Sequence, residues 1–216
     1  MFEKILNDEY IRGIYDGVTI YEELNDGQAH HNLIHVKNVV TTVEKVLKQL
    51  GYDNEYIEEA KIAALLHDLG AVEGKKDHAH RSYNMAKKYF EDNNINLKYH
   101  DLVLEAIKNH SEGFDSENMM TLSIIFSDKI DIKYDRVTKA GNGVEGVRQL
   151  KHIKDIQVDI REKTLVVDFF TDDEVDMKEL EEYYFLPKVF KAIRAFSKKI
   201  NLEPSINLNN DIWDKF

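Results

Sequence analysis

The sequence predicts a mainly α protein: a helical bundle followed by a small β-hairpin and a returning helix. Three observations favour this fold class. Apolar residues recur at helical spacing through the first 150 residues, the two prolines lie beyond that stretch, and the apolar spacing becomes alternating after Asp155. We therefore expect a helical part, residues 1–154, and an appendage, residues 155–216, that packs on the same core.

In the helical part, glycines are expected to end two of the predicted helices. Residues 33–50 place valines and leucines at i, i+3, i+4 and i+7, and Gly51 ends this predicted helix. Residues 55–69 are apolar almost all round towards their end, as in a helix that runs through a core, and Gly70 is expected to end them. Similar apolar faces predict three further helices, at about 78–92, 99–111 and 118–134.

The appendage combines two patterns. Apolar and polar residues alternate from Asp155 to Ile160, and a second apolar run from Leu165 to Phe170 follows a short charged segment, which is typical of a β-hairpin. A last helix is expected to begin near Pro187, because proline is tolerated in the first helical turn. Its apolar face would consist of Val189, Phe190, Ile193, Phe196 and Ile200.

Composition excludes several classes of protein. The chain of 216 residues has a formal net charge of −11 and no cysteine, so any metal must be held by histidine, aspartate or glutamate. The acidity disfavours binding to duplex nucleic acid, although residues 155–182, with eleven acidic and three basic side chains, account for most of it. Without a signal-like N-terminus or a membrane-length apolar run, we expect a cytoplasmic protein with no membrane partner, and a homodimer stays an open alternative.

Several predicted helices direct a histidine or an aspartate towards the apolar interior. These residues are His35, the pair His67-Asp68, His110 and Asp128. A single buried histidine is usually satisfied by a backbone carbonyl, but neighbouring carboxylates in an apolar bundle cost several kcal/mol unless a cation compensates them. A divalent metal is the most economical explanation. Imidazole and carboxylate ligands suit Fe, Mn, Co, Ni or Zn.

This pattern resembles the H…HD…D signature of the HD-domain metal-dependent phosphohydrolase superfamily. The motif-bearing part spans about residues 30–132, and it also contains segments similar to the family's H-A-x-x-[SG] and A-I-x-x-H, at residues 78–82 and 106–110. The resemblance implies an HD-type helical bundle that binds one or two divalent transition metal ions, bridged by Asp68 where two bind. The implied ligands are His35, His67, Asp68, His78, His110 and Asp128, with His80 as the alternative to His78.

Within this superfamily, the pattern is most similar to a small bacterial branch that hydrolyses diadenosine tetraphosphate. That branch usually carries a lysine three residues after the HD aspartate; this chain has Ala71 there, and Lys75 and Lys76 are the available substitutes. The resemblance implies hydrolysis of a nucleotide or another small phosphorylated metabolite. The alternatives are a symmetrical dinucleoside tetraphosphate hydrolase, a non-catalytic metal or nucleotide sensor, and an HD-fold metal oxygenase.

A phosphohydrolase needs activated water and positive charge near the phosphate, and a divalent ion supplies both. We expect Asp68, Lys129 and Arg81 to be catalytic and Lys75, Lys76, Lys129, Lys133 and Arg136 to bind phosphate, although each cation could instead be a solvated surface residue.

Three further predictions concern residues beside the motifs. His31 is expected to line the site. Asp131 would either orient Lys129 or a ligand histidine, or form an ordinary helical salt bridge. The glycine-rich segment 141–146 would act either as a lid that carries Arg136 or Arg148 to the substrate, or as a plain connection to the hairpin.

Overall fold

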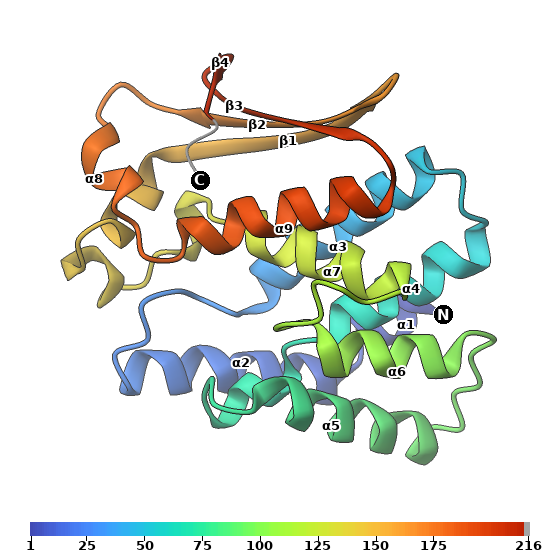
Figure 1. The fold of residues 1–216 in the computed structure, drawn as a ribbon. Coiled ribbons are helices and arrows are strands. Elements are labelled where there is room, and N and C mark those ends of the chain that lie inside the picture. The colour runs from blue at the N-terminus through green and yellow to red at the C-terminus, as the bar shows by residue number, and fades with distance from the viewer. Residues whose placement is uncertain (214–216) are drawn as a thin grey trace.

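The computed structural model describes residues 1–213, which form a helical bundle with a small sheet along one side (Figure 1). The helical part contains α1 (Phe2–Leu6), α2 (Glu9–Leu24), α3 (Leu33–Gln49), α4 (Asn54–Leu66), α5 (His78–Asp92), α6 (His100–Asn109) and α7 (Met119–Ile130). Short 3₁₀ segments are η1 (Leu69–Glu73), η2 (Tyr134–Arg136), η3 (Gly141–Gly143) and η4 (Val147–His152). The remaining elements are β1 (Ile153–Arg161), β2 (Thr164–Thr171), α8 (Met177–Glu181), α9 (Leu186–Lys199), β3 (Glu203–Leu208) and β4 (Asp211–Ile212). Among the described helices, none combines the length and the apolar character that a membrane crossing requires.

Side-chain caps set where the central helices begin. The Asn32 side chain accepts hydrogen bonds from the backbone amides of Ile34 and His35, so α3 begins immediately after it. Asp53 caps α4 and Asn118 caps α7 in the same way. Because the Asn32 cap fixes the first turn of α3, it also fixes the position of His35 within that turn.

The prediction that Gly70 ends the fourth helix is wrong. Helix α4 ends at Leu66, and Gly70 lies inside η1. Its lack of a side chain serves close packing instead, because a Cβ atom there would lie 2.3 Å from the carbonyl oxygen of His78 and 2.6 Å from the amide nitrogen of Ser82. The Gly70 amide donates to the Ser82 hydroxyl at 2.9 Å. Gly70 thereby brings the segment after Asp68 against the first turn of α5.

The helix predicted over 118–134 is shorter than expected. Helix α7 ends at Ile130, and Asp131 leaves the helical conformation with a ψ of 73°. The chain then turns back towards the beginning of α3. This early end places Asp131 beside His35, from which it is 96 residues distant in the sequence.

The predicted hairpin and returning helix are confirmed, but the sheet is larger than a hairpin. Strands β1 and β2 are antiparallel, whereas β3 pairs with β2 in parallel, from Thr164 opposite Glu203 to Phe169 opposite Leu208. Strand β4 completes the order β1-β2-β3-β4. The sequence pattern missed β3 because this short segment contains Pro204 and becomes a strand through its pairing with β2.

Helix α9 lies between the sheet and the other helices (Figure 1). The rings of Phe126 in α7 and Phe196 in α9 stack with their centroids 4.7 Å apart. On the sheet side, Trp213 packs edge-on against Phe169 in β2 and Phe190 in α9. The hydrophobic core therefore contains residues from both the helical part and the C-terminal segment.

Candidate metal centre

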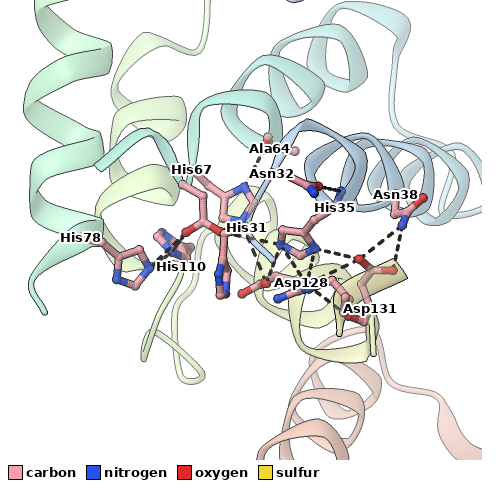
Figure 2. A network of polar contacts seen from close by, with 12 residues as sticks. His31, Asn32, His35, Asn38, Ala64, His67, His78, His110, Asp128 and Asp131 are labelled. Atoms are coloured by element: carbon pink, nitrogen blue, oxygen red, sulfur yellow. Dashed lines mark hydrogen bonds and ion pairs between the residues drawn. The ribbon is translucent and has the colours of Figure 1, made fainter. Parts of the chain in front are cut away.

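Side chains from three helices meet at one point in the bundle (Figure 2). His35 comes from the first turn of α3, His67 and Asp68 directly follow α4, and Asp128 lies in the last turn of α7. One ligand atom from each of these four residues lies within 4.8 Å of the others. His35 Nε2 is 3.2 Å from Asp128 Oδ1 and 3.7 Å from Asp68 Oδ2. We refer to these four residues as the first cluster.

A second cluster shares Asp68 with the first. It adds His78 from the first residue of α5 and His110 from the end of α6. Asp68 Oδ1 lies 3.2 Å from His78 Nε2 and 3.6 Å from His110 Nε2, whereas Asp68 Oδ2 lies 3.3 Å from His67 Nε2. Each carboxylate oxygen of Asp68 thus faces a different cluster. His80 is exposed, stacks on Tyr83 and, within the described residues, belongs to neither cluster.

The four histidines present the same nitrogen to the two clusters. In each of them Nδ1 lies within hydrogen-bond distance of an oxygen: Ala64 O for His67, Ile107 O for His110, Lys75 O for His78 and Asp131 Oδ2 for His35, at 2.7–2.8 Å. Because an acceptor at Nδ1 favours the tautomer with the proton there, Nε2 is left unprotonated, with a lone pair that can bind a metal. Figure 2 shows these rings turned towards the centre of the site.

Unsatisfied polar atoms indicate that these residues fit a cation. Over the part of the chain that the structure describes, His67 Nε2 and Asp68 Oδ1 are buried without a hydrogen-bond partner. Buried polar atoms of this kind are uncommon because they lose their interactions with water. A divalent ion bound by imidazole and carboxylate would satisfy both atoms.

The charge states of the ligands suit metal binding. Burial alone would raise the pKa of Asp68, but the charge of Lys75 and the imidazole of His67 more than offset it and hold the pKa well below its usual range. Burial also opposes ionisation of Asp128, and Lys129 and His35 keep its pKa well below normal. Burial lowers the pKa of His110 to about 4. At neutral pH the site therefore offers two carboxylates and a neutral His110 imidazole.

Asp131 contacts the candidate ligand His35, and it also lies within ion-pair distance of Lys133 and Arg136, at 3.9 and 3.5 Å. Its Oδ2 atom accepts from His35 Nδ1 at 2.7 Å, and its Oδ1 atom accepts from the Asn38 side chain at 3.2 Å. Arg136 donates to the Asp131 carbonyl oxygen at 3.1 Å and contacts the His35 ring. A carboxylate on the distal nitrogen of a histidine ligand fixes the ring and makes it a stronger donor to a metal.

The Asp131→Asn variant is expected to bind metal about tenfold more weakly than the unchanged protein, because loss of such a carboxylate typically costs about 10–100-fold in affinity. Competition with a fluorescent chelator would measure this. Asp135→Asn is the matched control, since Asp135 also accepts from Asn38, at 3.3 Å, without a described contact to His35. Equal affinities of the two variants would contradict this role for Asp131.

A cavity of about 1220 Å³ opens over both clusters, and three of the predicted phosphate-binding cations line it. Lys75 Nζ lies 3.6 Å from Asp68 Oδ1, Lys129 contacts the Asp128 carboxylate, and Arg136 contacts His35. This placement is consistent with the expectation that Lys75 substitutes for the lysine that the branch usually has at the position of Ala71. Positive charge therefore surrounds the carboxylates on the cavity side.

The other predicted cations are Arg81, Lys76 and Lys133. None of them is among the described residues that line the cavity. Arg81, predicted to be catalytic, donates to the carbonyl oxygens of Gly70 and Lys76 at 2.9 and 2.6 Å and also contacts the carbonyl of Gly74, so it holds the loop that carries Lys75. The Lys76 side chain is exposed, and Lys76 contacts Arg81 through its backbone carbonyl oxygen. Lys133 lies between the carboxylates of Asp131 and Asp135, at 3.9 and 4.0 Å.

In the segment between α7 and the sheet, the two arginines of the predicted lid have different surroundings. Arg136 reaches the cavity from η2, but Arg148 pairs with Glu179 at 2.8 Å. Gly141 packs against the backbone of Gln28, where a Cβ atom would lie 2.2 Å from the carbonyl oxygen. These contacts agree with the interpretation of residues 141–146 as a packed connection.

Sequence reasoning missed Glu22, which is buried beside the site. Its carboxylate Oε1 lies 2.6 Å from His31 Nδ1, and His31 lines the cavity as expected. Glu22 continues the buried face of α2 formed by Ile11, Tyr15 and Val18. An acidic residue at a core position of an amphipathic helix was therefore the signal that could have revealed it.

Aromatic residues of the C-terminal segment were also missed. Tyr183, Tyr184 and Phe185, between α8 and α9, line the cavity together with Lys188. They lie more than 50 positions after Asp128 in the sequence. Periodicity gives no signal for such a turn, because its residues reach the site only through the packing of α9 on α7.

Comparison with known proteins extends the resemblance beyond the motifs. A family model described as HD domain matches residues 32–209, which include α3 to α9 and the first three strands. A search of curated proteins found no match.

Proposed function

Because the chain belongs to the HD domain family, we propose that it is a metal-dependent phosphohydrolase acting on a nucleotide or another small phosphate ester or anhydride. Hydrolysis of phosphate compounds is the general activity of that family. The observation that carries the proposal is the division of the Asp68 carboxylate, with Oδ2 towards the first cluster and Oδ1 towards the second. Such an arrangement supports two neighbouring metal ions held by one shared ligand.

The first cluster would hold one ion and the second cluster another. Divalent ions supply a nucleophile from water near neutral pH and neutralise charge on the phosphoryl oxygens. The chain's own residues then determine the position of the substrate. Lys75, Lys129 and Arg136 line the cavity beside the clusters, so their charges would hold phosphate oxygens there. Asp131 and the backbone acceptors keep the four imidazoles in the orientation that binding requires.

A symmetrical dinucleoside tetraphosphate hydrolase is the second candidate. The cavity of about 1220 Å³ exceeds the ~300–1,000 Å³ of ordinary small-molecule sites, which favours a long substrate. Lys75 provides a cation 3.6 Å from Asp68, although Ala71 stands at the sequence position where that branch usually has a lysine. Retention of both clusters favours either enzyme over a non-catalytic sensor.

Metal analysis combined with a phosphate panel tests the proposed function. The purified protein is expected to contain Fe, Mn, Co, Ni or Zn, and to hydrolyse at least one of ribose 5-phosphate, AMP, ATP and diadenosine tetraphosphate. Chelation should abolish the activity and added metal should restore it. Faster cleavage of diadenosine tetraphosphate to ADP than of AMP would select the second candidate. A protein that neither retains nor binds these ions and that cleaves no phosphate compound after metal addition would contradict both.

A further inference from the structure

Part of the cavity is lined by aromatic residues that none of the metal-binding motifs includes. Tyr183, Tyr184 and Phe185 form the turn between α8 and α9, and we call them the aromatic wall. We infer that this wall binds a planar ring of the substrate, with Tyr184 as the residue that determines specificity. The inference rests on the proposed function and narrows its substrate class to phosphates that carry a nucleobase or a similar ring.

Tyr184 has the exposure expected of a binding residue. Tyr184 lines the cavity and 67% of the residue is accessible to water, whereas the adjacent Tyr183 is 6% accessible. Covering an exposed aromatic face with another ring removes apolar surface from water and adds stacking energy. The Tyr183 ring stands edge-on to Tyr184, with centroids 5.2 Å apart, and supports it from within the structure.

The aromatic wall lies close to the first cluster. Lys129 Nζ contacts Asp128 and is 6.0 Å from the centroid of the Phe185 ring. One lysine side chain thus connects a metal-ligand carboxylate with the wall. A phosphate held at the clusters would have its attached sugar and ring directed along this side of the cavity.

Local contacts hold the wall in place before any substrate binds. Glu179 of α8 accepts from the Gly146 amide and from the Gln149 side chain, both at 2.9 Å. Gly146 has a φ of +75°, and a Cβ atom there would lie 2.7 Å from the Cα atom of Tyr183. The glycine therefore permits close packing of the connection before η4 against the wall. A rigid wall loses little conformational entropy when a ring stacks on it.

The polar groups around the wall suit a nucleobase better than an apolar chain. Asn25 and Gln28 line the same cavity and offer amide donors and acceptors to the edges of a base. Lys108 of α6 adds positive charge outside the clusters, whereas Lys188, in the first turn of α9, is paired with Glu112 at 2.5 Å, and Glu112 also lines the cavity.

The test compares two phosphates that differ at C1 of the ribose, where AMP carries adenine and ribose 5-phosphate carries a hydroxyl group. AMP and ribose 5-phosphate carry the same phosphate ester on the same sugar position, so the ratio of their kcat/KM values reports contacts to the base. We expect the metal-loaded full chain to favour AMP. Tyr184→Ala should lower the ratio about tenfold, which lies within the range measured for base stacking on aromatic side chains. Tyr184→Phe, which keeps the ring, should preserve it.

Tyr10→Ala is the matched control, because Tyr10 is a comparably exposed tyrosine (59%) on α2 and is absent from the described residues that line the cavity. Binding of non-hydrolysable phosphonate analogues of the two compounds, measured by calorimetry, gives a readout without turnover. The affinity ratio should change in the same direction as the kcat/KM ratio.

The outcomes separate the two proposals. Equal efficiencies for AMP and ribose 5-phosphate, or an unchanged ratio in Tyr184→Ala, would overturn the ring-binding wall while leaving the phosphohydrolase intact. Preferential binding of the adenosine phosphonate that depends on the Tyr184 ring, without hydrolysis of any phosphate, would support the wall and contradict the proposed function.

Discussion

The Asp68→Asn variant is expected to lose phosphohydrolase activity by about a thousandfold or more. Both clusters depend on this carboxylate, and an uncharged amide cannot provide an anionic oxygen to each of them. Metal ions contribute several kcal/mol to transition-state stabilisation, and each 1.36 kcal/mol corresponds to a factor of ten in rate. Elemental analysis of the purified variant should also show a loss of metal from both clusters.

The Asp16→Asn variant is the control for this experiment. Asp16 is an exposed residue of α2, so removing its charge should change neither metal content nor rate. Circular dichroism of both variants would verify that the helices are retained. An Asp68→Asn protein with normal metal content and normal activity would contradict the assignment of Asp68 as the shared ligand.

The His78→Ala variant is expected to lose the ion of the second cluster and about a hundredfold in activity. His78 and His110 belong to that cluster alone, so the first cluster keeps all four of its ligands. The second ion of a two-metal site helps to stabilise the charge that develops during phosphate displacement. Metal stoichiometry and kcat should therefore fall together, from two ions per chain to one.

His80→Ala provides a closely matched control, because His80 lies on the same helix two residues further along and is exposed. It should keep both ions, because His80 belongs to neither cluster among the described residues, and metal stoichiometry is the readout for this control since His80 also lines the cavity. His110→Ala should resemble His78→Ala in metal content, but the side chain of His110 is only 1% exposed against 15% for His78, so its loss also leaves a cavity in the core. If His78→Ala and His110→Ala both retain the normal rate, a single ion suffices for the reaction.

The site residues that the sequence revealed share one property. His35, His67, His110 and Asp128 each lie at helical spacing from apolar residues of the same predicted helix, so local periodicity directs them inward. The same property would have identified Glu22 on α2, where the apolar face ends in a buried acid. A polar residue at a core position is visible in a sequence because it breaks a pattern.

Basic residues have no comparable signal. Lys75 and Lys76 are adjacent in one loop, yet Lys75 reaches Asp68 whereas Lys76 offers only its carbonyl to Arg81. A loop has no periodicity that would distinguish the two. The outcome depends on how Arg81 ties the loop to the start of α5, which is a property of the packed structure.

Residue order alone predicts the mainly helical fold, the hairpin, the returning helix and a set of inward-facing candidate ligands. These features depend on the spacing of apolar side chains within single elements, and this spacing can be read directly from the sequence. Four features are visible only in the folded chain: which oxygen of Asp68 faces which cluster, the contact of Asp131 with His35, the pairing of β3 with β2, and the place of Tyr184 at the cavity. Each of these depends on contacts between distant segments, because packing of whole helices and strands, rather than local spacing, fixes their relative positions.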